Sequence, residues 1–241
     1  MSGHSKWNNI KHKKEKSDAA KAKIFTKIGK EMAVAIKAGG PDPNNNSKLR
    51  DLIAKAKANN VPNDNIQRTI KKFTDNSDIN YEEIVYEGYG PSGVAIIVET
   101  STDNRNRTAG NVRAAFNKYG GNLGQNGCVS FLFEEKGVIT IVDEDDEIDE
   151  DKIMEDALEC GAEDIKCDEG EYTIYTAVSD FDTVREAIIA LGYKLDTADL
   201  AKVPSTYVDL TNPDDVENME KMLDKFNEDD DVNAVYHNWD N

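Results

Sequence analysis

The residues with the clearest chemical capacity lie near the start of the chain. The segment GHSKWNNIKHKK combines cations, rings and amides with few apolar anchors. Ammonium groups bind phosphate oxygens, and aromatic or imidazole rings stack on exposed bases. A hydrophobic contact with the following helix is the alternative for Trp7. The candidate nucleic-acid contacts from this part of the chain are His4, Lys6, Trp7, Lys11, His12, Lys13, Lys14 and Lys16.

A stripe of lysines continues along the helix that is expected over Asp18–Ala38. At about 100° per residue, Lys23, Lys27 and Lys30 share one side. The apolar residues on the other side are Ile24, Phe25, Ile28, Met32, Ala35 and Ile36. A solvated helix face usually mixes both signs of charge, and acids are almost absent between these lysines. The stripe is therefore predicted to bind phosphates, with an ordinary solvated face as the alternative.

Two further helices are expected over Lys48–Asn59 and Asn63–Phe73. Their apolar sides would complete a small three-helix bundle with the first helix. The third helix directs Arg68, Lys71 and Lys72 outward, and these three join the candidate nucleic-acid contacts. The pair of helices resembles a helix-turn-helix only weakly, because the pattern supplies no evidence of base reading.

The charge of the chain is divided into two blocks. Residues 1–73 carry 17 basic and 6 acidic side chains, a net charge of +11, whereas the whole chain has a net charge of −18. The remaining 168 residues therefore carry −29. A basic block releases counterions from phosphates, and an acidic block repels them. Contact with nucleic acid is predicted mainly through the first third of the chain.

From Tyr81 onward, short strand-like runs alternate with helical patterns. Strands are expected over Tyr81–Glu87, Val94–Thr100 and Val129–Phe133, and a helix from Thr102 or Asp103 to about Tyr119. Residues 138–203 follow the order β-α-β-β-α-β, which is ferredoxin-like. The last strand and helix patterns, after residue 206, would complete the unit that begins at Tyr81, although the pattern alone does not establish that pairing.

Several motifs that suggest chemistry are explained more simply by turns and solvated loops. The glycine-rich run Gly88–Gly93 lacks the Lys-Ser/Thr of a phosphate-binding loop, and Gly120–Gly127 follows a helix instead of opening one. The acidic run Asp143–Asp151 lacks the glycine and the spaced glutamate of a calcium loop. No nucleophile constellation or zinc spacing is present. We therefore predict a protein that is not an enzyme, with no metal and no cofactor.

Arg105, Arg107 and Arg113 form a basic island in the acidic part of the chain, at the start of an expected helix. Salt bridges to nearby acids are one explanation. The alternative is a second contact with RNA or protein, so these arginines are kept as a possible second binding site.

The composition also indicates a compartment. No apolar run exceeds five residues, so a membrane span is not expected. The first residues lack the apolar core of a signal peptide. Three cysteines without a CxxC spacing fit a reducing environment. A cytoplasmic location is therefore expected.

Five motifs, taken together, resemble the YebC/PmpR family, which includes the mitochondrial translational activator of cytochrome oxidase. The resemblance covers essentially the whole chain. Departures are mild: an Asn-rich loop at Pro41–Ser47, Cys128 in place of a usual Ser, and Phe131 in place of a common Trp. The motifs that carry the resemblance are Gly3–Lys14, Ala56–Ile66, Tyr86–Ala95, Thr102–Thr108 and Gly121–Gly124.

The resemblance implies an α+β fold with an N-terminal three-helix domain followed by two small α/β domains, the last ferredoxin-like and inserted in the second. The expected boundaries are 1–75 for the basic helical domain, 80–136 plus 204–241 for domain two and 137–203 for domain three. It also implies a regulator of gene expression. The family is usually described as DNA-binding transcriptional regulators, and other work on it indicates a ribosome-associated factor that aids synthesis through proline-rich stretches.

The net charge of the basic block fits DNA and RNA equally, but the residue types favour RNA slightly as the partner. A basic segment with aromatic residues suits folded RNA, and only two arginines occur before residue 74. In favour of a duplex, the third helix opens with Asn63, Asn65, Gln67 and Arg68, which are side chains suited to reading a major groove.

Overall fold

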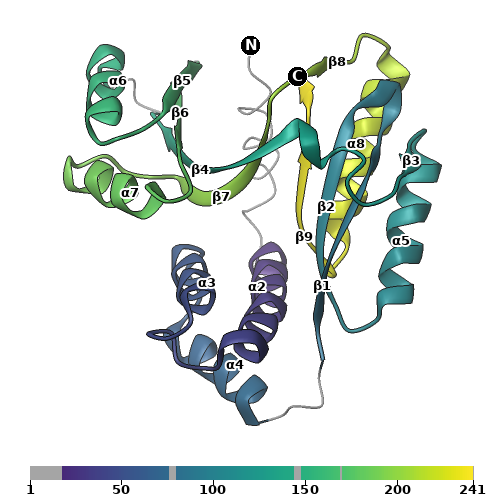
Figure 1. Ribbon diagram of the computed structural model, residues 1–241, viewed down its shortest axis with the longest axis horizontal. Coiled ribbons are helices and arrows are strands. Elements are labelled where there is room, and N and C mark those ends of the chain that lie inside the picture. Colours follow the sequence, from purple (N-terminus) through teal and green to yellow (C-terminus); the bar gives the residue numbers. More distant parts are fainter. Residues whose placement is uncertain (1–17, 76–79, 144–147, 169, 241) are drawn as a thin grey trace. The chain divides into compact units, whose positions relative to one another are not determined.

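The computed structural model describes residues 18–75, 80–143, 148–168 and 170–240. A helical region is followed by two four-stranded antiparallel sheets with their own helices (Figure 1). The expected α+β fold is therefore confirmed. The described residues of 18–130 and 210–237 form one compact unit, and those of 131–209 and 238–240 form another. The boundaries of the three-domain division stay a prediction.

In the helical region, the described residues form three helices that pack through their apolar sides. Each lies within two residues of its expected bounds. Ile28, Met32, Leu49 and Ile66 are buried in the shared core. Phe25, which was expected on the apolar side, is only half-buried and lies outside this core cluster. The helices are α2 (Asp18–Gly39), α3 (Ser47–Ala58) and α4 (Asn63–Asp75).

The Asn-rich connection between α2 and α3 is held by Asn46, which is buried. Its side-chain oxygen accepts from the N–H of Leu49 at 3.0 Å and caps α3. Its amide nitrogen donates to the carbonyl of Ala35 at 2.8 Å, near the end of α2. Gly40, with φ of 84°, takes the left-handed conformation that ends a helix with little steric cost. One side chain thus fixes the turn between two helices.

The first sheet has the strand order β3-β1-β2-β9, with antiparallel pairs throughout. Its last strand comes from the C-terminal part of the chain and pairs with β2, so the strand expected near residue 232 does complete the unit begun near residue 81. The strands are β1 (Glu82–Tyr89), β2 (Ala95–Thr102), β3 (Asn122–Leu123) and β9 (Val232–His237).

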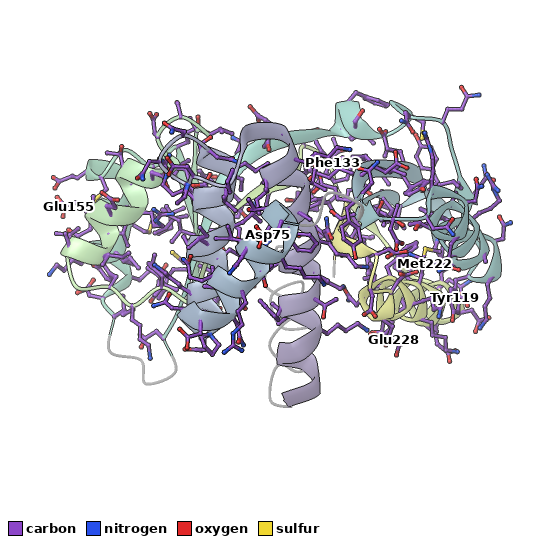
Figure 2. All side chains as sticks on the ribbon, turned by 90° about the horizontal axis from the view of Figure 1, so that it is seen from below. Asp75, Tyr119, Phe133, Glu155, Met222 and Glu228 are labelled. Atoms are coloured by element: carbon purple, nitrogen blue, oxygen red, sulfur yellow. The ribbon has the colours of Figure 1, made fainter. Side chains whose placement is uncertain are left out.

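Two helices, α5 (Arg105–Lys118) and α8 (Pro213–Glu228), pack against each other and against this sheet (Figure 1). The rings of Phe116 and Phe226 join them with centroids 5.4 Å apart. Met222 of α8 is fully buried in the same layer (Figure 2). Helix α2 contacts β1, β2 and β9, and β2 is buried along nearly its whole length.

The second sheet has the strand order β5-β6-β4-β7. With the chain order β-α-β-β-α-β, this is the ferredoxin-like arrangement that the sequence predicts. Its core includes Ile139, Ile141, Ile153, Ile174 and Ile188. The elements are β4 (Phe133–Val142), α6 (Glu150–Glu159), β5 (Asp164–Asp168), β6 (Glu171–Thr176), α7 (Phe181–Ala190) and β7 (Thr197–Pro204). A short parallel pair, β8 (Val208–Asp209) with β10 (Trp239–Asp240), accompanies it.

The strand expected over Val129–Phe133 is wrong. A 3₁₀ turn, η2 (Ser130–Leu132), occupies this place, and the strand begins at Phe133. The reason is Glu87, whose side chain is buried. Its carboxylate accepts from the N–H groups of Gly127 at 2.8 Å, and of Val129 and Ser130 at 2.9 Å each. These donors are satisfied by a side chain instead of a neighbouring strand.

Glu87 carries its charge despite burial. Burial alone would raise the pKa of this carboxyl, but the three backbone N–H donors lower its pKa below the ordinary value. An ionised acceptor therefore fixes the loop between β3 and β4.

Glu87→Gln is expected to destabilise the fold by about 2 kcal/mol, because hydrogen bonds to a charged acceptor are replaced by weaker ones and an amide NH₂ would face backbone donors. The lowered pKa means that the stabilisation is complete above the ordinary glutamate range, near about pH 4.3, and is lost as pH falls through the folded-state pKa. Urea unfolding at neutral and acidic pH measures both effects. Glu82→Gln on the same strand, at an exposed position, is the control, and an equal loss in both variants would contradict the role of Glu87.

Candidate nucleic-acid interface

The candidate contacts from the first part of the chain lie outside the described residues, and their role stays a prediction. They are His4, Lys6, Trp7, Lys11, His12, Lys13, Lys14 and Lys16. The described candidates are the lysines of α2, the cations of α4 and the arginines of α5.

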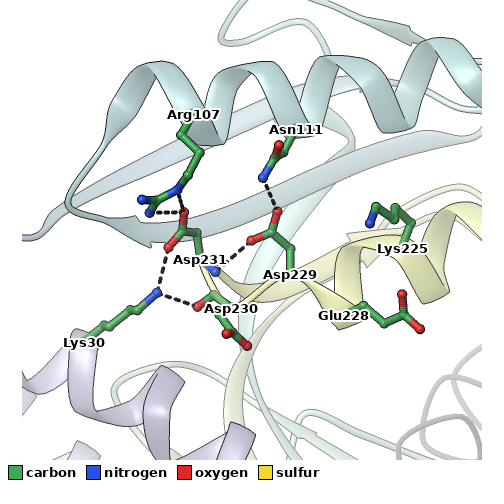
Figure 3. A pocket seen from close by; sticks show the side chains of 8 residues that line it. All are labelled: Lys30, Arg107, Asn111, Lys225, Glu228, Asp229, Asp230 and Asp231. Atoms are coloured by element: carbon green, nitrogen blue, oxygen red, sulfur yellow. Dashed lines mark hydrogen bonds and ion pairs between the residues drawn. The ribbon is translucent and has the colours of Figure 1, made fainter.

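The three candidate lysines of α2, Lys23, Lys27 and Lys30, share one face, as expected, but that face is not simply solvated. It lies against the acidic loop, which we define as Glu228–Asp231. Figure 3 shows this loop beside Lys30. The Nζ of Lys23 donates to the carbonyl of Glu228 at 2.5 Å, and the Nζ of Lys27 to the carbonyl of Asn227 at 3.2 Å. The stripe therefore has a protein partner.

Lys30 makes the strongest contact with the acidic loop. Its Nζ lies 2.7 Å from Oδ1 of Asp231 and 2.9 Å from the carbonyl of Asp230. Only 12% of the Lys30 side chain is exposed. Burial, together with repulsion from Lys23, lowers the pKa of Lys27 to about 8. The lysines expected to face solvent are in part dehydrated by their own chain.

Asp231 joins three elements through one carboxylate (Figure 3). Besides Lys30 of α2, its side chain accepts from Arg107 of α5 at 2.7 Å (Nη2) and 3.1 Å (Nε), and from the hydroxyl of Thr108 at 2.8 Å. Asp231 itself directly precedes β9 and is 3% exposed. Burial would raise its pKa, but the hydrogen bonds from Lys30, Arg107 and Thr108 lower the pKa to about 2.

The three arginines of α5 differ in their contacts. Arg107 pairs with Asp103 at 2.8 Å and with Asp231, and these hydrogen bonds raise its pKa. For this residue, the salt-bridge explanation matches the contacts. Arg105 and Arg113 are exposed, and neither forms an ion pair with a described residue. A second binding site at these two positions stays a prediction.

The cationic α4 face, which we define as Arg68, Lys71 and Lys72, is exposed along the helix. Within the described parts of the chain, none of the three forms an ion pair. The Nζ of Lys72 lies 5.3 Å from the centroid of the Phe73 ring, a contact that leaves the ammonium group accessible. These cations can bind external phosphates without first breaking an internal salt bridge.

Two functional features were missed by reasoning from the sequence: the acidic loop as partner of α2, and Glu87 as the anchor of a loop. The run Glu-Asp-Asp-Asp at 228–231 is visible in the sequence and separates a helix from a strand. Its lysine partners lie about 200 residues away, and no local pattern links the two segments. For Glu87, the available signal was a third glutamate near the end of a strand whose other two, Glu82 and Glu83, stand at its start.

Other kinds of site find no support in the described part of the chain. It contains no group of three or more His, Cys, Asp or Glu side chains placed to hold a metal ion. Cys128, Cys160 and Cys167 are free thiols, and burial raises the pKa of each. None of the described helices has the length and apolar character to cross a membrane.

Comparison with known proteins gives consistent matches along the whole chain. The model of the TACO1/YebC N-terminal domain matches residues 5–76, and the model of the TACO1/YebC second and third domain matches residues 81–239. A "Probable transcriptional regulatory protein" of Acetivibrio thermocellus is 56% identical over 240 residues and 99% of each chain. One of the same name from Agathobacter rectalis is 56% identical over 241 residues and all of both chains.

A solved structure is also similar. The crystal structure of a conserved hypothetical protein from Aquifex aeolicus superimposes with a TM-score of 0.82 and 41% sequence identity. The match covers 92% of this chain and 91% of that one.

Proposed function

The chain belongs to the TACO1/YebC family, and on that basis we propose that it is a nucleic-acid-binding regulator of gene expression and not an enzyme. The observation that carries the proposal is the cationic α4 face, which is exposed and unpaired among the described residues, in the most basic third of an acidic chain. The names of its relatives, as probable transcriptional regulatory proteins, support the same class. Such a regulator would act in the cytoplasm.

The lysine stripe contributes to this proposal differently from α4. Lys23, Lys27 and Lys30 can give these hydrogen bonds to a phosphate only if the acidic loop and the preceding Asn227 move away, because these residues already supply their acceptors. The α4 face needs no such movement. The proposed primary contacts are therefore Arg68, Lys71 and Lys72, together with the basic residues before α2.

DNA is the partner that the names of the relatives suggest. The start of α4 supports it, because Asn63, Gln67 and Arg68 are all exposed there. Amide and guanidinium side chains on one helix read base edges in a major groove. In this version of the proposal, α4 is the reading helix and the lysines fix its register on the phosphates.

A ribosome-associated translation factor that binds ribosomal RNA, and aids synthesis through proline-rich stretches, is the second candidate. Phe25 favours it, because the ring is half-exposed beside α4 and outside the helical core. Duplex reading does not need an aromatic surface, whereas RNA recognition commonly stacks unpaired bases on one.

Salt dependence tests the proposal as a whole. If about six cations engage duplex phosphates, log K should fall with log salt concentration with a slope of about −5. Fluorescence anisotropy of the full chain with labelled DNA or RNA at several salt concentrations measures this slope. A slope near zero for both nucleic acids would overturn the proposal.

Crosslinking in cells, followed by sequencing of the bound nucleic acid, separates the two candidates. Enrichment of promoter DNA supports the transcriptional role and rejects the ribosomal one. Enrichment of ribosomal RNA has the opposite meaning.

A further inference from the structure

A shallow groove of about 240 Å³ lies between α2 and α4. Phe25 forms its aromatic side, while α4 contributes Asn65, Arg68, Thr69 and Lys72. Phe25 lies on the side of α2 opposite to the lysine stripe, because two residues correspond to about 200° of rotation from Lys23. The groove is thus separate from the acidic loop, and α4 cations form part of its border.

The groove adjoins a contact between the two helices at Gly29 and Thr69. Gly29 is buried there, and a Cβ atom at this position would lie at an ordinary contact distance, 3.8 Å, from the methyl carbon of Thr69. Phe25 is one helical turn before Gly29, and its ring is not part of the core cluster that Ile28 and Met32 form. An aromatic ring is therefore kept at the surface, where it offers a flat apolar face.

We propose that this groove binds an unpaired nucleobase of single-stranded RNA. The base would stack on Phe25, the Asn65 amide would face the base edge, and Arg68 and Lys72 would bind the flanking phosphates. The inference rests on the proposed function and specifies its ligand: a single-stranded segment, recognised by one stacked base.

Charge complementarity selects this occupant over an apolar or acidic peptide. None of the described residues that line the groove is acidic, and two of them are cations without an ion-pair partner in the described chain. An apolar peptide would form no ion pair with either cation, and an acidic peptide would not stack on the Phe25 ring. A nucleotide uses both. By contrast, a larger cavity of about 430 Å³ at the acidic loop includes four acidic residues among its lining, which repel phosphates.

The test compares two short RNAs of the same charge, one intact and one with abasic sites in its centre, binding to the full chain. Both keep every phosphate, so they differ only in the central bases, which supply the stacking face and the hydrogen-bonding edge. The intact RNA is expected to bind about fivefold or more tightly than the abasic RNA, because stacking of one base on an aromatic ring has an effect of this size. Both RNAs should show the same dependence on salt.

Phe25→Leu keeps an apolar side chain and removes the ring. This variant is expected to bind the intact RNA as weakly as the abasic RNA. Arg50→Gln is the matched control, because Arg50 is an exposed cation of α3 outside the groove, and this variant should keep the preference for intact RNA. Circular dichroism checks that both variants are folded.

A second measurement uses the unaltered protein. With 2-aminopurine in the centre of the RNA, binding should quench its fluorescence, and pairing the RNA into a duplex should abolish this quenching because the base face is hidden. If intact and abasic RNA bind equally, in a salt-dependent manner, the groove proposal fails and the proposed function stands. If neither RNA binds in a salt-dependent manner, and DNA does not either, the proposed function itself fails.

Discussion

Asp231→Asn is expected to lower the free energy of unfolding by about 3 kcal/mol at neutral pH. The substitution removes the negative charge that Lys30 and Arg107 share, and Lys30 would stay largely buried without its carboxylate. This loss of stability is at the lower end of the range for breaking a buried ion pair, about 3–5 kcal/mol, because Arg107 keeps Asp103 as a partner and is partly exposed to water. Urea unfolding of the full chain measures the difference.

The pH dependence of this effect has a definite sign. The pKa of Asp231 is lowered to about 2, so its stabilisation is present above the unfolded-state pKa of about 3.9 and is lost as pH falls toward 2. A carboxyl shifted by this amount contributes about 2.6 kcal/mol at neutral pH. Since Asn does not titrate, the gap between the wild-type protein and Asp231→Asn should narrow between about pH 5 and pH 2.

The neighbouring Asp230 provides the control. Its side chain is 65% exposed and lies 3.9 Å from Lys23, while Lys30 contacts its backbone carbonyl, which Asp230→Asn retains. Asp230→Asn should therefore change stability by less than about 0.5 kcal/mol. Equal losses for the two variants would show that the acidic loop acts as a diffuse charge, without a specific role for Asp231.

The elements that were predicted well are those whose signals are local. Helices α3 and α4 begin and end close to their expected limits, since caps, prolines and apolar spacing lie within the segments themselves. The ferredoxin-like order followed from alternation in the same way. The strand expected at Val129 failed because Glu87, about forty residues earlier, takes the N–H groups that a strand would have used.

In the candidate site too, local features could be predicted from the sequence, and contacts between distant segments could not. The sequence correctly placed Lys23, Lys27 and Lys30 on one face, because helical geometry is a local property. The sequence did not reveal which segment contacts that face, because the acidic loop lies about 200 residues later in the chain. A count of cations therefore overestimates the charge available to an external ligand. Among the described candidate contacts, the cations of α4, together with Arg105 and Arg113 of α5, are exposed and form no ion pair with a described residue.

That difference leads to the variant with the largest expected effect on binding: the triple substitution Arg68→Gln, Lys71→Gln and Lys72→Gln. If each cation neutralises one phosphate, the slope of log K against log salt should become less steep by about 2.7 for duplex DNA, and affinity near physiological salt should fall about a hundredfold. Folding should be retained, because the three side chains are exposed and Gln is a good helix former. Anisotropy titrations at several salt concentrations measure both quantities.

The matched control removes three exposed charges elsewhere, with Arg50→Gln and Lys57→Gln on α3 and Lys118→Gln on α5. Both triple variants change the net charge equally, so a long-range effect of total charge should weaken binding to the same extent in each. Direct contact predicts a large loss for the α4 variant and a small one for the control. Equal losses would place the interface away from α4, and an unchanged slope in both would leave the residues before α2 as the contacts that carry binding.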